Sequence, residues 1–430
     1  MAFQNLPTEI LLMIGERADD KPLQSVCLTC RRFMDLFYEM AFHTAKLDDT
    51  PESAKDILAL VSGSRNHLIR KIHYTPRDPW GRSAREIALL KKRHPGPVQY
   101  PTNKPYMRFA NETDQAFDSL EKLGLGKLKF QFDLRGWDLN QWREDCLTVN
   151  REIQPYYEEN WLEFIEASFK ALARIIMSIS HLEINGLPHL ASKIRYYHFQ
   201  PFKTVGPVWS ITTFEISLAE VNERFEACTN AHRSFVWRLP RTFFRYLTDV
   251  QNLKIMGTEN AVIESPGFEA IAWDDCEMKW LESFEIEYSH ITDELLCFLY
   301  RRVKSWKKLC FRNCFGERKR RWLDLIQMFL HEQPTKLVEF EIVSYPVRLR
   351  HGQPDYFEKG DVHGYGMSKE AKKEKMRRFV VGKANLTIKN FEPAEIHADD
   401  DDPELDESDV IERWKELEGL MERNKKRPAW

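Results

Sequence analysis

The chain has 430 residues, of which 43% are hydrophobic and 12% are aromatic, and its 63 Lys and Arg residues nearly balance its 66 Asp and Glu residues. A single core seldom holds so many residues, so the length predicts two or three domains or one elongated array. The composition excludes a largely disordered chain, and a formal net charge of −3 argues against a protein that gathers polyanions over its whole surface.

Hydropathy and cysteine usage indicate the compartment. No apolar run reaches the roughly 20 residues that a membrane-spanning helix needs, and the first residues lack the features of a secretion signal. The eight cysteines are scattered along the chain rather than grouped as in small disulfide-stabilised domains. We therefore expect a cytoplasmic or nuclear protein whose cysteines are mostly buried thiols.

The first predicted elements are short amphipathic helices. Ile10, Leu11 and Ile14 fall on one helical face that begins after Leu6 and Pro7. After a polar break, apolar residues recur every three or four positions at Val26, Cys27, Cys30, Phe33, Met34 and Phe37. Such stripes usually pack against the chain that carries them, but a binding partner could cover the same face. Periodicity alone does not separate these alternatives.

The same residues carry a resemblance to a known family. LPTEIL at 6–11, LTCRRF at 28–33 and Phe42 after a short helix resemble the F-box, especially its variant common in fungal proteins. The resemblance implies three helices that dock on the Skp-type adaptor of an SCF ubiquitin ligase, which bridges to a cullin. On this resemblance the adaptor-binding residues are Leu6, Pro7, Ile10, Leu11, Ile14, Val26, Leu28, Cys30, Phe33 and Leu36.

A recurring triplet, apolar-x-x-apolar-x-apolar, follows the N-terminal helices and is typical of the strands of leucine-rich repeats. It begins at Ile69, Leu125, Ile179, Ile211, Val250, Leu281, Trp306 and Leu337. The last four sites are separated by 31, 25 and 31 residues, near the period of such repeats. Upstream the separations are 56, 54, 32 and 39 residues, so the array there is irregular or is not an array.

Helical patterns lie between the last triplets. Two apolar stripes occupy 291–299 and 322–329, namely Ile291, Leu295, Phe298 and Leu299, then Trp322, Leu325, Ile326 and Phe329. We predict an α+β or α/β fold, with three N-terminal helices followed by an irregular leucine-rich-repeat-like solenoid of parallel strands and outer helices. Strands should begin near Phe214, Leu253, Phe284, Leu309 and Phe340. Outward positions would include Lys254, Ser283, Glu285, Lys308, Cys310, Glu339 and Glu341, and the sequence assigns no substrate contact among them.

Catalytic and metal motifs give weaker signals. GDVHG at 360–364 contains the Asp-x-His of two-metal phosphatases, but the strand that should precede it and the remaining ligand motifs are missing. Cys27 and Cys30 have zinc-ligand spacing without a nearby second pair, since Cys310 and Cys314 lie far along the chain. No nucleotide-binding or hydrolase motif is present. We expect no catalytic residues, metal ligands, cofactor or enzyme activity in this chain.

The predicted boundaries are 1–47 for the adaptor-binding helices, 48–345 for the repeat region, 346–395 for an irregular and basic segment, and 396–430 for an acidic linker and a C-terminal helix. A Pro-rich surface insertion at 91–109 and a basic helix at 369–378 are also expected. The C-terminal helix places Ile411, Trp414, Leu417 and Met421 on one side. We expect truncation at Glu395 to leave the fold intact, because four consecutive Asp residues make a poorly packed linker.

These observations predict a substrate-recognition subunit of an SCF-type ubiquitin ligase. The F-box-like helices would bind the adaptor, and the repeats would bind an unknown protein target, without membrane or nucleic-acid partners. The alternative is an adaptor-bound structural or regulatory protein without a role in ubiquitin transfer. Both need the same docking helices, so the sequence does not separate them.

Overall fold

The computed structural model of the chain describes residues 6–18, 20–48, 50–64, 66–75, 111–132, 179–187, 210–218, 228–258, 262–264, 271–273, 278–316, 321–343, 378–381, 384–387 and 407–427. The Pro-rich stretch 91–109, GDVHG at 360–364, the basic stretch 369–377 and the acidic stretch 398–406 lie outside the described residues.

The chain divides into two compact units. The first unit comprises Met1–Asn222 with Tyr246–Val250, and the second comprises Glu223–Arg245 with Gln251–Trp430. Both are built from parallel strands and helices, so the predicted α/β class is confirmed. No helix within the described ranges is long and apolar enough to span a membrane.

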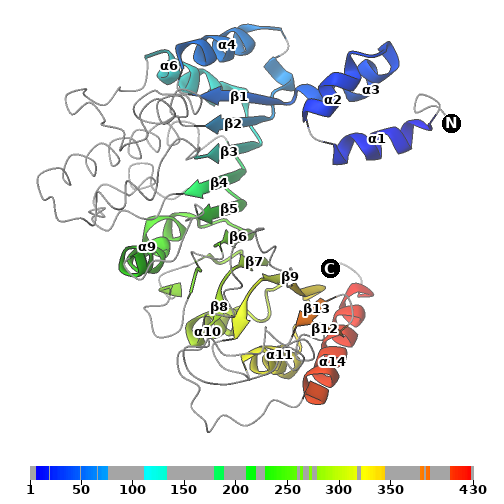
Figure 1. Cartoon of the computed structure of the whole chain (residues 1–430), viewed down its shortest axis with the longest axis vertical. Coiled ribbons are helices and arrows are strands. Elements are labelled where there is room, and N and C mark those ends of the chain that lie inside the picture. The colour runs from blue at the N-terminus through cyan, green and yellow to red at the C-terminus, as the bar shows by residue number, and fades with distance from the viewer. Residues whose placement is uncertain are drawn as a thin grey trace, which may run out of the picture. The chain divides into compact units, whose positions relative to one another are not determined.

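The first unit begins with three helices and continues into a parallel sheet. Its elements are α1 (Thr8–Arg17), α2 (Asp20–Cys27), α3 (Arg31–Phe42), β1 (Thr44–Asp48), α4 (Pro51–Ser62), η2 (Asn66–Leu68), β2 (Lys71–Thr75), α6 (Asn111–Leu120), η3 (Glu121–Leu123), β3 (Lys127–Gln131), β4 (His181–Leu187) and β5 (Thr213–Leu218). Strands β1 to β5 pair in sequence order, and every pair is parallel (Figure 1). The N-terminus of α4 is capped by Thr50, whose hydroxyl accepts the Ser53 N–H at 3.2 Å.

The second unit repeats the strand and helix alternation. Its elements are α9 (Cys228–Thr242), β6 (Asn252–Met256), β7 (Ser283–Glu287), β8 (His290–Ile291), α10 (Asp293–Arg301), β9 (Lys308–Arg312), β10 (Phe315–Gly316), α11 (Arg321–Glu332), β11 (Glu339–Val343), β12 (Arg378–Val381), β13 (Ala384–Thr387) and α14 (Glu407–Lys425), and η5 (Phe244–Tyr246) follows α9 along the chain. Strands β6, β7, β9 and β11 form a parallel sheet in that order. The short pair β8–β10 is also parallel, whereas β12 and β13 pair antiparallel.

The triplet pattern predicts the strands of both units correctly. The eight triplets supply the inward side of β2 to β7, β9 and β11, and all their apolar side chains are buried. Side chains alternate between the two faces of a strand, so each triplet places its last two residues on one face and leaves the position between them outward. Strand β1 was not predicted, because one of its two inward residues is the small Ala45 and the other, Leu47, is a single large apolar residue.

The predicted helices α10 and α11 cover the inward face of the second sheet. The ring of Phe298 in α10 packs edge-on against Phe284 of β7, with centroids 5.8 Å apart. The ring of Phe329 in α11 packs in the same way against Phe340 of β11, at 5.5 Å. Helix α10 begins at a Thr292 cap, whose hydroxyl accepts the Leu295 N–H at 3.3 Å. Both predicted apolar stripes are therefore confirmed as core.

The C-terminal region differs from the sequence expectation in two ways. The segment 346–395, predicted to be irregular, contains the antiparallel hairpin β12–β13. The C-terminal helix α14 packs onto the second unit, where Trp414 is 2% exposed and its ring lies 5.8 Å from that of Phe340. Asn424 Nδ2 donates to the carbonyls of Pro334 and Leu337, both at 2.8 Å. Helix α14 is therefore not a separate tail, because it packs on the end of the sheet, and this packing argues against the expectation that truncation at Glu395 is harmless.

Candidate functional site

The helices α1 to α3 enclose a small core of their own. Its buried members are Leu11, Leu23, Cys27, Phe33, Phe37 and Ala41. Two side-chain hydrogen bonds to backbone tie the helices together: Gln24 Nε2 donates to the Ala41 carbonyl at 2.9 Å, and Arg32 donates to the Leu6 carbonyl at 3.0 Å. Helices α1 to α3 therefore share a core that is made of their own side chains.

Large apolar side chains remain exposed outside that core. Ile10, Met13 and Ile14 of α1 are 43%, 50% and 39% exposed, and Leu28, in the turn between α2 and α3, is 78% exposed. Positions 10, 13 and 14 share one helical face because they are three or four residues apart. Exposed apolar side chains that share one helical face, as Ile10, Met13 and Ile14 do, commonly mark an interface. We call Pro7, Ile10, Met13, Ile14 and Leu28 the apolar surface of the N-terminal helices.

The ten residues predicted to bind an adaptor fall into three groups. Pro7, Ile10, Ile14 and Leu28 are exposed, while Leu6, Val26, Cys30 and Leu36 are partly buried against the helical core. Leu11 and Phe33 are buried, at 0% and 3% exposure. These two predicted adaptor-binding side chains therefore lie in the core of the helices and not on their surface. Phe33 stacks on Phe37 of the same helix, with ring centroids 5.9 Å apart, and both rings belong to the core of the N-terminal helices.

Sequence reasoning missed Met13, the second most exposed of these residues. The available signal was its position three residues after Ile10 and next to Ile14, on the face away from Leu11. A helix whose residues 10 to 14 are all apolar has more apolar surface than one narrow stripe can bury. The sequence shows that excess of apolar residues. It does not show which side of α1 faces the other two helices.

The outward face of the first sheet carries polar residues in register across its strands. One row runs Thr44, Lys71, Lys127, His181, Thr213, and the next runs Lys46, His73, Lys129, Glu183, Glu215. Neighbouring strands lie about 4.8 Å apart, so side chains in one row are within reach of each other. Cations gather on β1 to β3, and carboxylates on β4 and β5.

Glu183 is the centre of an ion-pair network on this face. Its carboxylate oxygens lie 2.8 Å from Lys127 Nζ and 2.7 Å from Lys129 Nζ. Burial alone would raise the pKa of Glu183, but the hydrogen bonds from the two lysines outweigh it and lower that pKa to about 2. Glu215 in turn accepts from His181 Nε2 at 2.7 Å, which helps to keep the pKa of Glu215 below its usual range.

His181, Glu183 and Glu215 are also the one group of potential metal-ligand side chains found among the described residues, with ligand atoms within 4.8 Å of one another. Two ammonium groups already contact Glu183, and its Oε1 also accepts from Asn185 Nδ2 at 2.6 Å. A metal ion that bound there would have to displace the two ammonium groups that already pair with Glu183. It would also have to give up part of its own hydration shell. The arrangement fits a structural ion-pair network better than a metal centre.

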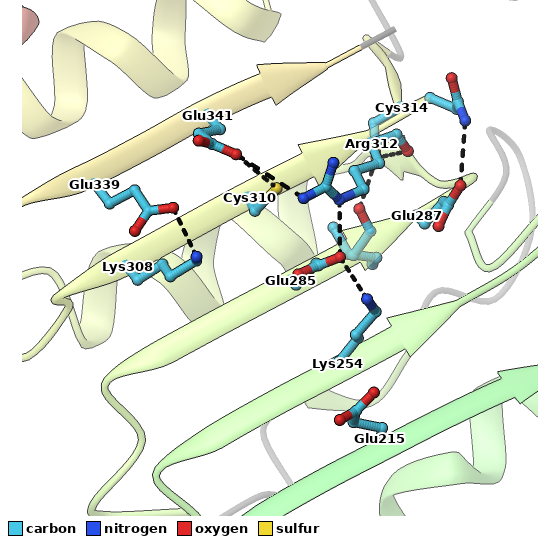
Figure 2. A network of polar contacts seen from close by, with 12 residues as sticks. Glu215, Lys254, Glu285, Glu287, Lys308, Cys310, Arg312, Cys314, Glu339 and Glu341 are labelled. Carbon is cyan, nitrogen blue, oxygen red and sulfur yellow. Dashed lines mark hydrogen bonds and ion pairs between the residues drawn. The ribbon is translucent and has the colours of Figure 1, made fainter. Parts of the chain in front are cut away.

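The second sheet has its own outward network, which Figure 2 shows. Glu285 Oε1 lies 2.8 Å from both Lys254 Nζ and Arg312 Nε, and Arg312 also approaches Glu341 at 3.9 Å. Lys308 pairs with Glu339 at 2.6 Å. Burial opposes ionisation of Glu285, but its hydrogen bonds to Lys254 and Arg312 prevail and keep its pKa below the usual value. The predicted outward positions are thus occupied by charges that largely neutralise one another.

The cysteines of this region lack the features of a reactive site. Cys310 is fully buried beneath the network, and burial raises the pKa of its thiol to about 12. Burial also raises the pKa of Cys314, whose Sγ donates to the Ile286 carbonyl at 3.5 Å. A thiolate is the reactive and metal-binding form, and burial disfavours it at both positions. In the N-terminal helices, Cys27 Sγ lies 3.8 Å from the Phe33 carbonyl within the helical core.

No family model matches the chain, and no curated protein matches it. Among solved structures, a crystal structure of a protein from Bacteroides fragilis is similar over 73% of this chain and 77% of its own, with 9% sequence identity and a TM-score of 0.31. These values are too low to support an argument about family or function.

A buried carboxylate joins three separated parts of the second unit. Glu264 is 3% exposed, and its Oε1 accepts from Ile271 N at 3.2 Å and from Trp273 Nε1 at 2.8 Å. Its Oε2 accepts from the Thr292 hydroxyl, the cap of α10, at 2.7 Å. Burial raises the pKa of Glu264 to about 7, although these three donors act in the opposite direction.

We expect Glu264→Gln to remove part of the pH dependence of stability. The folded-state pKa lies above the unfolded value, so the stabilising effect of the protonated group is present in acid and is lost as pH rises through about 7. At pH 8 the variant should therefore be more stable by roughly 3 kcal/mol, because an amide stays neutral while keeping an acceptor for Ile271 and Trp273. Thermal melting from pH 5 to 8 measures this, with Glu416→Gln, at an exposed position of α14, as the control. A variant that is less stable than the wild type at pH 8 would show that the ionised form is the one the fold needs.

Proposed function

We propose that the chain is the substrate-recognition subunit of an SCF-type ubiquitin ligase. Helices α1 to α3 would act as an F-box that binds the Skp-type adaptor and, through it, a cullin. The parallel strands with their inward helices would form a divergent leucine-rich-repeat-like solenoid that presents a protein target. This proposal combines the sequence resemblance at 6–42 with the geometry of the same residues.

The observation that carries the proposal is that the N-terminal helices bury some of their apolar side chains and leave others exposed. Leu11, Phe33 and their neighbours fill a core that belongs to these helices, yet Ile10, Ile14 and Leu28 remain exposed. Apolar side chains of this size each contribute about 1.5–3 kcal/mol when they are fully removed from water. A soluble partner that covered them would gain enough to offset the cost of association.

The direct test is the triple variant Ile10→Ala/Ile14→Ala/Leu28→Ala in the full-length chain. All three side chains are exposed, so the melting temperature should remain that of the wild type. The affinity for a purified Skp-type adaptor should fall by about 30- to 1000-fold, which corresponds to about 2–4 kcal/mol. The matched control is Leu60→Ala on α4, an exposed leucine in the same unit at 50% exposure. Wild-type affinity in the triple variant, or no adaptor binding by the wild type, would refute the docking assignment.

A second experiment addresses ubiquitin transfer itself. Proteins that co-purify with the chain should be compared with and without an inhibitor of cullin activation. Partners that accumulate only under inhibition would be substrates of the ligase. If the adaptor co-purifies and no partner responds to the inhibitor, the chain is instead an adaptor-bound regulatory protein.

A further inference from the structure

The charge on the outward face of the first sheet is not evenly balanced. The two rows defined above place Lys46 on β1, Lys71 on β2, and Lys127 and Lys129 on β3. Lys127 and Lys129 both pair with Glu183 of β4, and Lys127 also approaches Glu215 of β5 at 4.0 Å. Within the part of the chain that the structure describes, Lys46 and Lys71 have no ion-pair partner. The β1 and β2 end of the face therefore carries the unpaired positive charge.

His73 lies in the middle of these lysines. In its row it stands between Lys46 and Lys129, and it shares strand β2 with Lys71. Burial together with these three ammonium groups keeps the pKa of His73 below its usual value, and the nearby Glu183 only partly opposes them. Its Nε2 atom is buried and has no hydrogen-bond partner. An anion bound here would form ion pairs with Lys46 and Lys71. It would also favour protonation of the His73 imidazole, which could then donate a hydrogen bond to it.

Two features of the face limit what kind of anion it suits. Glu183 and Glu215 on the next strands would repel a long polyanion that crossed the whole sheet, so the favourable stretch spans only three strands, or about 10 Å. The outward positions of β1 to β3 are Lys, His, Thr, Asp and Gln, so they offer no Phe, Tyr or Trp ring on which a nucleobase could stack. Both features favour a short acidic stretch of polypeptide over a nucleic acid.

We propose that the outward face of β1 to β3 binds a short acidic segment of a partner protein, with Lys46 and Lys71 as the principal contacts and His73 next to both. This inference rests on the proposed function in one respect, because the acidic segment would belong to the protein that the chain presents. Charge complementarity carries the proposal: the site offers the cations of Lys46 and Lys71, and the ligand supplies the carboxylates that pair with them.

The binding test uses the full-length chain and a fluorescently labelled peptide of alternating Asp and Ser residues. Anisotropy at low ionic strength should show binding that weakens as salt is added, whereas the same peptide with Asn in place of Asp should not bind. The variant Lys46→Glu/Lys71→Glu should weaken binding by at least about 10-fold. The control is Lys55→Glu on α4, an exposed lysine of the same unit, which should change affinity by less than about 2-fold.

A second readout reports on the site rather than on net charge. In a chain with isotopically labelled histidine, saturation with the Asp peptide should raise the pKa of His73, because a nearby carboxylate favours the imidazolium. The resonance is assigned by its loss in His73→Gln. The Asn peptide should leave that pKa unchanged.

Several outcomes would overturn the proposal. These are no binding of the Asp peptide, equal binding by the double charge reversal, or an unchanged His73 pKa at saturation. Tighter binding of a single-stranded oligonucleotide of equal charge would assign the surface to nucleic acid instead. Adaptor binding is measured on the same variants and should be retained by all of them. If adaptor binding fails while the peptide still depends on Lys46 and Lys71, then the ligase assignment fails and the acidic-segment site stands.

Discussion

Phe284→Asp is expected to unfold the second unit. The ring is completely buried and contacts the rings of Trp273, Phe298 and Trp306, with centroids 5.8, 5.8 and 6.1 Å away. Loss of a buried phenylalanine costs about 3–5 kcal/mol, and a carboxylate among aromatic rings without a cationic partner adds several more. The sum approaches the whole stability of a typical domain, about 5–15 kcal/mol. Limited proteolysis should show rapid cleavage within 251–430 in the variant and slow cleavage in the wild type.

The matched control lies one residue earlier on the same strand. Ser283→Asp introduces the same charge on the outward side of β7, next to Lys308 of β9. Its stability should change by less than about 1 kcal/mol, since a surface ion pair contributes little in either direction. Similar proteolysis of the two variants would mean that β7 tolerates a charge on either face. The assignment of its inward side would then be wrong.

This contrast between neighbouring residues explains why the sequence predicts the sheets so well. A strand with one buried face shows its period directly, and each triplet fixes which residues point inward. Parallel pairing of β6, β7, β9 and β11 then follows from the helices or long connections between them. Strand β1 was missed because Ala45 contributes too little apolar character to complete a triplet.

The candidate sites were less predictable, because they depend on which parts of the chain meet. Leu11 and Ile10 are adjacent apolar residues, and only the packing of α1 against α3 decides that one is buried and the other exposed. Likewise the ion pairs of Glu183 join strands whose residues are more than fifty positions apart. The local sequence pattern identifies which residues of a strand point outward. Which residues they pair with depends on the register between strands, and that register is not visible in the local pattern.

The C-terminal helix gives the second large effect. Trp414→Ala should lower the free energy of unfolding of the second unit by about 3–5 kcal/mol, because the indole is buried and packs edge-on against Phe340 of β11. For a unit of this size that loss corresponds to a fall of about 6–20 °C in melting temperature. The acidic composition before α14 suggested a separate tail, but composition describes the linker and not the apolar side of the helix that follows it.

The control variant is Lys415→Ala, which changes the adjacent, exposed residue of α14 and should leave the melting temperature within about 2 °C. Asn424→Ala provides an independent measure, because it removes both hydrogen bonds to the carbonyls of Pro334 and Leu337. Leaving buried carbonyls unpaired should cost about 1–3 kcal/mol. Truncation at Glu395 should be at least as harmful as Trp414→Ala, since it removes the indole together with the rest of α14. A truncated chain with the wild-type melting temperature would show that α14 packs on the sheet without stabilising it, as the acidic linker alone had suggested.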